Sequence, residues 1–408
     1  MTPWFALLAA LLAVSGDEAS LTTLDGQTIS GVVSAWDGTE LTIDAADGDQ
    51  KLATDAIMDV AWKREPSAGP TLRVAELVDG SRLAFEEFTI AKRTATFQLP
   101  GQQAKVEVPT ARIKRIELVA ASEPLAKMLA EIEQKQPAGD SLVIVKGEAM
   151  DYLSGVVEDV TAQQADFRWD GEKVPVKLSK IAAIVFYHAK EAALPEALCR
   201  VSFTNGSVVV ARQAQLEKQQ LQLKSLGGVD VEFPFDQVAR IDFSSGKIAY
   251  LSDLKPATSR WTPRVALPAD AKLIASFGAP RQNVAFDGSQ LSLLWDDDPV
   301  PARRDVRTYS RGLAVRSRTE QTYLVPEGMT RFAVTAGIDP ATAGQGNVAL
   351  EIRGDDRILW EGTIDGGGPP VEIDVELQAA RRLQLVVDYG DNLDYGDRLH
   401  LIEARFIK

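Results

Sequence analysis

Four segments of the chain end in one short pattern: an apolar residue, two variable residues and a second apolar residue that leads into a strand-like stretch. These segments are Ile57–Val60, Ile113–Ile116, Ile181–Ile184 and Val238–Ile241. Their final residues are spaced 56, 68 and 57 positions apart. A pattern that recurs at such intervals predicts a chain built from small repeated units rather than from one large core.

Turn signals precede the pattern at a constant distance. Asp25-Gly26, Asp79-Gly80 and Asn205-Gly206 lie 31, 33 and 32 residues before the first apolar position of their segments. Such dipeptides supply the positive φ angles that tight hairpins need. The third unit has no such dipeptide, but Ser154–Val157 repeats the Ser-Gly-Val-Val of Ser30–Val33 at the same distance.

Between these landmarks, apolar and polar residues alternate. Examples are Leu41-Thr42-Ile43 and Leu221-Gln222-Leu223. This period of two predicts short antiparallel strands with one buried face. Units of about 50 residues with four or five such strands resemble SH3-like or Sm-like small barrels. The expected Ile-x-x-Ile core residues are Ile113, Ile116, Ile181, Ile184 and Ile241.

One helix explains the longer middle interval. From Ser122 to Gln136, apolar residues recur at the helical positions 125, 128, 129 and 132. Ser122 suits an N-cap and Pro137 ends the pattern. We predict repeats 1 and 2 over residues 17–120, a connecting helix over 121–139 that packs on the barrels, and repeats 3 and 4 over 140–250. The alternative is a helix that binds a partner.

The N-terminus carries an apolar run from Trp4 to Val14. It is too short to span a bilayer as a helix, and small residues follow it at Ser15 and Gly16. We therefore expect residues 1–16 to be a signal peptide and the protein to be exported, either to the periplasm, the cell surface or the medium. The alternatives are a membrane anchor or a buried first helix. No later segment is long and apolar enough for a transmembrane helix.

Composition excludes several classes of function. The net charge of −14 disfavours nucleic acid as a partner. The single cysteine, Cys199, permits no intramolecular disulfide, and two histidines cannot form a three-histidine metal site. The common catalytic motifs for acyl and phosphoryl transfer are absent. Glycoside hydrolysis needs only two carboxylates, so the acidic residues alone do not exclude it.

The C-terminal third carries a series of motifs in a defined order. They include Asp287–Leu293, Tyr309–Ser317, Thr330–Asp339, Gly346–Ile352 and Leu383–Asp397. In order and spacing these segments resemble the NPCBM family, a family of carbohydrate-binding modules associated with glycoside hydrolase family 98. The resemblance implies a β-sandwich jelly roll of the galactose-binding type over residues 266–408, joined by a linker at 251–265. The alternating pattern independently predicts strands at 331–336, 348–352, 371–377 and 383–387.

The chain departs from the family pattern at two places. Family members usually have Gly-Val-His-Ser where this chain has Ala314–Ser317, and Asp-His-Ala-Asp-Trp where it has Asp397–Leu401. The missing Trp removes a possible core anchor or stacking face. Because of these changes, the resemblance predicts the fold but not the identity of a sugar.

The tail loop Tyr389–Asp397 combines aromatic and hydroxyl-bonding side chains, which is what a sugar site needs. The candidate glycan-binding residues are Tyr389, Asp391, Asn392, Asp394, Tyr395, Arg311, Arg316 and Trp295. Alternatively, the loop is a connection whose side chains satisfy its own backbone. Jelly rolls of this type often hold a structural calcium ion, for which the candidate ligands are Asp391, Asn392, Asp394, Asp397 and Glu403. The alternative for these acids is solvation. No other cofactor is expected.

The sequence thus predicts an exported all-β protein with four SH3-like repeats, a short helix and a jelly roll. The predicted function is non-catalytic binding of a glycan or envelope polysaccharide. The alternatives are a structural adaptor that binds envelope proteins, and an accessory or cryptic glycoside hydrolase.

Overall fold

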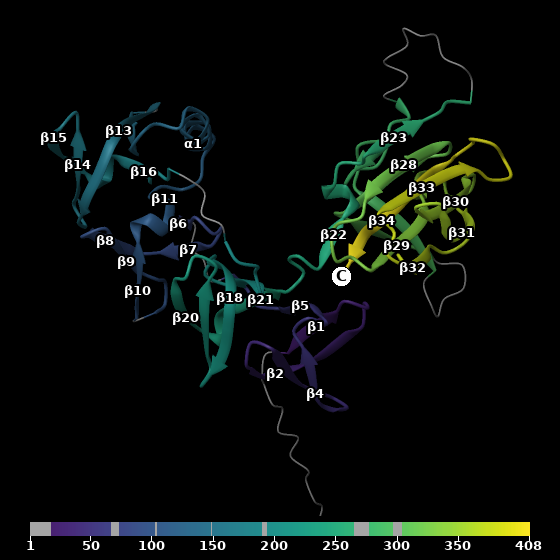
Figure 1. Cartoon of the computed structure of the whole chain (residues 1–408), viewed down its shortest axis with the longest axis horizontal. Helices are drawn as coiled ribbons and strands as arrows, with labels where there is room; N and C mark the ends of the chain where they lie inside the picture. The colour runs from purple at the N-terminus through teal and green to yellow at the C-terminus, as the bar shows by residue number, and fades with distance from the viewer. Residues whose placement is uncertain are drawn as a thin grey trace, which may run out of the picture. The chain divides into compact units, whose positions relative to one another are not determined.

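The structure is a computed structural model that describes residues 18–66, 73–102, 104–147, 149–189, 194–264, 277–296 and 304–408. The chain divides into an N-terminal unit, Met1–Ser245, and a C-terminal unit, Gly246–Lys408 (Figure 1). The expected signal peptide lies outside the described residues. Within the described part, no helix is long and apolar enough to cross a membrane.

The N-terminal unit begins with a five-stranded antiparallel arrangement. Its first strand is paired on both sides, with the second and with the fifth, and the second, third and fourth strands form a meander. The strands are β1 (Ala19–Thr23), β2 (Thr28–Trp36), β3 (Glu40–Ala45), β4 (Gly48–Ala53) and β5 (Ile57–Trp62).

The same pairing pattern recurs three more times along the chain, except that in the next set the second strand is divided into β7 and β8. The next set is β6 (Arg73–Leu77), β7 (Arg82–Phe85), β8 (Glu87–Ala91), β9 (Thr94–Gln98), β10 (Lys105–Pro109) and β11 (Ile113–Glu117). Then follow β12 (Asp140–Lys146), β13 (Ala149–Val160), β14 (Gln164–Trp169), β15 (Glu172–Lys177) and β16 (Ile181–Val185). The last set is β17 (Cys199–Phe203), β18 (Val208–Glu217), β19 (Gln220–Ser225), β20 (Asp230–Pro234) and β21 (Val238–Asp242). This recurrence supports the repeat interpretation.

Glycine has one role in the Asp-Gly and Asn-Gly turns and another in the Ser-Gly-Val-Val segments. Gly26, Gly80 and Gly206 have φ between 82° and 87°, as the predicted turns require. In the shared Ser-Gly-Val-Val segments, Gly31 and Gly155 let neighbouring strands approach. A Cβ at these positions would lie 2.4 Å from the carbonyl oxygen of Asp44 and 2.3 Å from that of Arg168.

The Ile-x-x-Ile residues are core residues, as predicted. Ile113, Ile116, Ile181, Ile184 and Ile241 are all buried in one hydrophobic cluster. They lie on the last strand of each set, and these strands also pair with one another. β11 pairs with β16, which places Ile116 opposite Ile184, and β21 pairs with β5, which places Ile241 opposite Val60.

This pairing connects repeats across the expected groups. The sequence grouped repeats 1 and 2 over 17–120, and repeats 3 and 4 over 140–250. The last strands join repeat 2 to repeat 3 and repeat 1 to repeat 4. The physical reason is that a half-paired last strand completes its ladder with whichever equivalent strand is presented to it, regardless of the distance along the chain.

Repeats 2 and 4 meet through their equivalent turns. The backbone N–H of Ala84 donates to Ser207 Oγ, and the N–H of Val210 donates to Ser81 Oγ, each over 3.0 Å. The Asp79 carboxylate accepts from the N–H groups of Ser81 and Gly227 over 2.9 and 2.7 Å. These buried polar groups are therefore satisfied by one another.

The predicted connecting helix is α1 (Glu123–Lys135). The Ser122 side chain accepts a hydrogen bond from the N–H of Leu125, as an N-cap does. Leu125 and Ile132 are buried with Val143 and Ala182 of repeat 3. The helix is thus packed on a barrel, as expected.

The C-terminal unit is a β-sandwich. One sheet has the order β24-β27-β34-β29-β32, with β22 on β34, and the other has the order β23-β28-β33-β30-β31. Their strands are β22 (Ile248–Tyr250), β23 (Thr258–Trp261), β24 (Arg281–Gln282), β27 (Gly312–Arg316), β28 (Thr319–Leu324), β29 (Arg331–Ile338), β30 (Asn347–Gly354), β31 (Arg357–Asp365), β32 (Val371–Glu376), β33 (Arg382–Tyr389) and β34 (Arg398–Ile407). A hairpin of β25 (Leu291–Asp296) and β26 (Arg304–Tyr309) forms a separate two-stranded sheet. Figure 1 draws this unit in green to yellow.

The sandwich begins earlier than the sequence indicated. Residues 251–265 were expected to form a linker, but β23 lies within them and pairs with β28. Before them, β22 pairs with the last strand, β34. The error arose because an edge strand with a largely exposed face, such as Thr258–Trp261, has no apolar alternation to reveal it.

Candidate functional site

Three connections between the two sheets gather at one end of the sandwich, which we call the loop end. The first joins Arg316 of β27 to Thr319 of β28, the second joins β29 to β30, and the third is the segment from Tyr389 to Arg398. Register brings their residues together, since Arg316 lies opposite Arg398 and Tyr389 lies opposite Val348. The predicted tail loop is therefore part of a composite surface.

The tail loop is fixed to the start of β30. The N–H of Gly390 donates to the carbonyl oxygen of Asn347 over 2.9 Å, and the N–H of Asp391 donates to Asn347 Oδ1 over 3.3 Å. The side-chain amide of Asn392 donates to the carbonyl oxygen of Gln345. Asn392 therefore supports the loop, and it matches the alternative in which a loop side chain satisfies backbone groups.

The two tyrosines of the loop differ in environment. Tyr395 is 65% exposed, so its ring offers a free face. Tyr389 is half-buried, its hydroxyl is enclosed, and the Arg318 guanidinium lies over its ring at 5.8 Å. Only Tyr395 therefore has the exposure that stacking on a sugar requires.

The acidic residues of the loop also divide into two kinds. Asp394 is half-exposed and forms an ion pair with Arg264 over 3.5 Å. Asp397 is buried, and its carboxylate accepts hydrogen bonds from the N–H of Asn347 and from Ser317. Burial raises the pKa of Asp397. Asp394 and Asp391 thus remain available at the surface, while Asp397 holds the loop to its neighbours.

Arg316 covers two aromatic rings at the loop end. Its guanidinium carbon is 4.5 Å from the centroid of Phe277 and 4.4 Å from that of Phe286. Arg281 also covers Phe286, at 5.4 Å. Phe277 is 59% exposed. The sequence identified Arg316 but missed Phe277, Phe286 and Arg281, because no motif links a segment before β25 to the end of β27.

Two predicted residues do not join this cluster. Arg311 lies at the opposite end of β27, where it forms an ion pair with Asp253 and covers the ring of Tyr250. Trp295 belongs to the β25–β26 hairpin, where its Nε1 donates to the Tyr309 hydroxyl over 2.8 Å and Arg307 covers its ring. Its ring is therefore partly occupied by contacts of the protein itself.

The predicted calcium ligands do not form one set. Glu403 is six residues along β34 from Asp397, or roughly 20 Å in an extended strand. Within the part of the chain that the structure describes, no group of three or more His, Cys, Asp or Glu side chains is arranged to hold a metal ion. Calcium binding by the tail loop stays a prediction.

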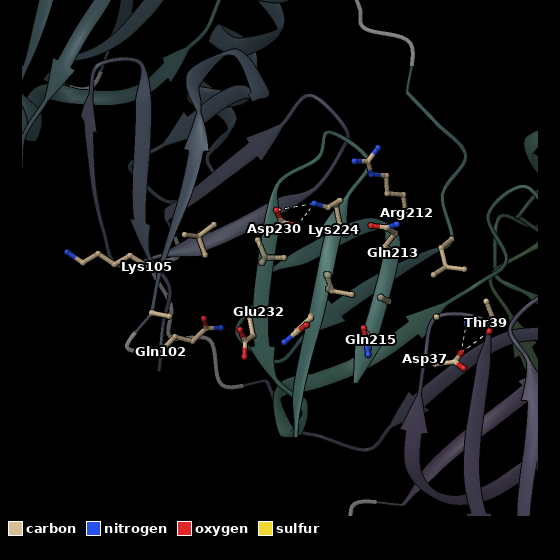
Figure 2. Close-up of a pocket in the computed structure, with 18 residues that line it drawn as sticks. Asp37, Thr39, Gln102, Lys105, Arg212, Gln213, Gln215, Lys224, Asp230 and Glu232 are labelled. Carbon is tan, nitrogen blue, oxygen red and sulfur yellow. Dashed lines mark hydrogen bonds and ion pairs between the residues drawn. The ribbon is translucent and has the colours of Figure 1, made fainter. Parts of the chain in front are cut away.

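A separate cleft of about 920 Å³ lies in the N-terminal unit (Figure 2). Its walls come from the faces of β18, β19 and β20, the start of β10 and the turn before β3. Figure 2 shows Lys224 beside Asp230, an ion pair of 2.8 Å, and Asp37 bonded to Thr39. Hydrogen bonds from the N–H groups of Glu40 and Thr39 lower the pKa of Asp37. None of the described residues that line this cleft is aromatic, so they offer no stacking face for a sugar.

Comparison with known families supports the assignment of the C-terminal unit. Residues 249–407 match the family model described as the NPCBM/NEW2 domain. This match confirms the resemblance that the motifs predicted for the C-terminal third. No curated protein matches the chain.

Several solved structures are similar to the chain at low identity. One is the structure of CBM51-2 in complex with GlcNAc and INT domains from Clostridium perfringens ZmpB. It is 21% identical to this chain and has a TM-score of 0.34. The match covers 50% of this chain and 42% of that structure's chain. A CBM51 from Clostridium perfringens GH95, in complex with methyl-galactose, is 19% identical over 39% of this chain and 99% of its own, with a TM-score of 0.32. The tandem CBM51 modules of Streptococcus pneumoniae Sp3GH98 are 14% identical over 82% and 87%, with a TM-score of 0.32. The chain thus spans less than half the length of the first of these.

Proposed function

We propose that the protein is a non-catalytic glycan-binding protein whose C-terminal unit binds sugar at the loop end. The observation that carries the proposal is the exposed ring of Tyr395 within a loop that is otherwise polar and tied to β30. An apolar sugar face stacks on such a ring, while neighbouring carboxylates accept hydrogen bonds from sugar hydroxyls. The match to the NPCBM/NEW2 domain supports the same function.

The roles of individual residues follow from their exposure. Tyr395 supplies the stacking face, and Asp391 and Asp394 accept hydroxyl hydrogen bonds. Tyr389, Asn392 and Asp397 hold the loop in place through contacts with neighbouring residues. Asp394 is already bonded to Arg264, so a sugar hydroxyl would share the carboxylate rather than find it free.

Replacement of Tyr395 by alanine is expected to weaken glycan binding by about 2- to 12-fold. This range corresponds to about 0.5–1.5 kcal/mol for the loss of one aromatic contact. A screen of the full chain on a glycan array would identify a ligand, and isothermal titration calorimetry would then compare the variants. Because the ring is exposed, the variant is expected to keep its melting temperature.

Tyr187 offers a matched control, since it is a 49% exposed tyrosine of the N-terminal unit. Tyr187→Ala is expected to leave binding unchanged. Equal losses in both variants would contradict a site at the loop end. If the folded chain binds no glycan on a broad array, the glycan proposal fails and the adaptor of envelope proteins becomes the better hypothesis.

We also propose that the protein acts outside the cytoplasm, on the basis of the apolar N-terminal run. Intact-mass spectrometry of the protein purified from its native source is expected to give an N-terminus near Gly16 or Asp17. Retention of Met1 in that sample would argue against cleavage. This measurement does not depend on the outcome of the glycan tests.

A further inference from the structure

Three arginines lie close together at the loop end. Arg316 and Arg398 occupy opposite positions on the paired strands β27 and β34. Arg281 begins β24, the strand on the other side of β27, where it pairs with Ala314. The guanidinium groups of Arg281 and Arg316 lie over the same ring, that of Phe286. We call Arg281, Arg316 and Arg398 the arginine cluster.

Among the described residues, none of the three donates a hydrogen bond to a carboxylate. Arg281 donates to the carbonyl oxygen of Ala285 over 3.2 Å. Arg398 forms an ion pair with Asp339 over 3.9 Å, which is longer than a hydrogen bond. Arg316 makes no ion pair among the described residues, and its Nε is buried without a hydrogen-bond partner.

Other arginines of this unit are paired differently. Arg331 has Asp374, Arg353 has Glu351 and Arg311 has Asp253 as direct carboxylate partners. At the loop end, the exposed Asp394 is held by Arg264, and Asp397 is buried beneath the surface. Asp287 accepts hydrogen bonds from Ser289. Within the described residues, three positive charges are thus offset by one long ion pair, between Arg398 and Asp339, and by the more distant charges of Asp287 and Asp394.

The arrangement has an electrostatic cost in the absence of a ligand. Burial lowers the pKa of Arg316, and the nearby charges of Arg398 and Arg281 lower it further. Arginine nevertheless stays protonated at ordinary pH, so the three charges repel one another. A bound anion would relieve this repulsion, and a guanidinium fork suits the paired oxygens of a carboxylate or a sulfate.

We infer that the glycan recognised at the loop end carries an oxyanion, as a carboxylate or a sulfate ester, which the arginine cluster receives. The inference rests on the proposed function and narrows its class of ligand. Asp394 connects the tail loop with the arginine cluster. Its charge acts on Arg316, and the next residue in the chain is Tyr395. The sugar ring would thus stack on Tyr395 while its anionic group reaches the arginines.

General electrostatic attraction does not explain such binding, because the chain has a net charge of −14. A protein with this charge repels polyanions at long range. Affinity for an acidic glycan therefore depends on a local, well-placed group of cations. Removal of one arginine of the cluster is therefore expected to lower the affinity for an acidic glycan more than an equal change in net charge elsewhere on the chain.

The test compares three ligands with one backbone: neutral galactan oligosaccharides, their sulfated form and the matching galacturonate oligosaccharides. Titration calorimetry with the full chain is expected to give at least about tenfold tighter binding for one or both anionic forms. Whichever anionic form binds more tightly shows whether the site prefers a sulfate or a carboxylate. Arg316→Gln and Arg398→Gln are each expected to bind that ligand with about tenfold lower affinity. Arg398→Lys is expected to recover part of this affinity.

Arg311→Gln is the matched control, since Arg311 also covers an aromatic ring in the same unit but lies at the other end of β27. It is expected to bind as the wild type does. If Arg316→Gln fails to fold, judged by its melting temperature, Arg398→Gln decides the matter. Equal binding of neutral and anionic forms would overturn the inference and leave the proposed function intact. Absence of binding by all three forms and by a broad array would overturn both.

Discussion

Replacement of Ile116 by alanine is expected to lower the free energy of unfolding of the N-terminal unit by about 2–5 kcal/mol. Ile116 is 0% exposed, and its strand β11 is paired on both sides, with β6 and with β16. The truncation removes apolar contacts and leaves a cavity between repeats 2 and 3, opposite Ile184. Urea denaturation followed by circular dichroism would measure the change.

The same chemical change at an exposed position provides the control. Ile358 of β31 is 54% exposed, and Ile358→Ala is expected to change stability by less than about 0.5 kcal/mol. A cost below about 1 kcal/mol for Ile116→Ala would mean that the junction of β11 and β16 does not contribute as the structure indicates. A double variant with Ile184→Ala is expected to be non-additive because the two residues face each other.

The sequence predicted the repeated strands well, because their signals are local. Alternation, Asp-Gly turns and the Ile-x-x-Ile pattern each depend on residues within one unit. The grouping of the repeats could not be predicted in this way. The pairing of Val60 with Ile241 joins residues that are far apart in the chain, and no local pattern distinguishes this partner from the neighbouring repeat.

The candidate site shows the same division between local and distant information. The sequence located the polar tail loop and its tyrosines, but it did not separate the exposed Tyr395 from the half-buried Tyr389. The arginine cluster draws on three separate segments. Arg316 and Arg398 were each visible as departures from a family motif, yet only strand register places them opposite one another.

The contact between repeats 2 and 4 gives a second large expected effect. Asp79→Ala removes the acceptor of two buried N–H groups, those of Ser81 and Gly227. Each buried donor left without a partner costs about 1–3 kcal/mol, so a total loss of about 2–6 kcal/mol is expected for the two donors. Asp79→Asn is expected to lower the free energy of unfolding less, because an asparagine can accept the turn hydrogen bond. At the equivalent turn of repeat 4, Asn205 accepts a hydrogen bond from the N–H of Ser207.

Asp25 is the matched control for this prediction, because it begins the equivalent Asp-Gly turn of repeat 1 and is exposed. Asp25→Ala is expected to cost well under half as much as Asp79→Ala in the same urea titration. Equal costs would mean that Asp79 acts only within its own turn and that the hydrogen bond to Gly227 contributes little. A large difference would instead assign the extra stability to the contact between repeats, because the Ser81 bond lies within the Asp79 turn and the Gly227 bond crosses to repeat 4.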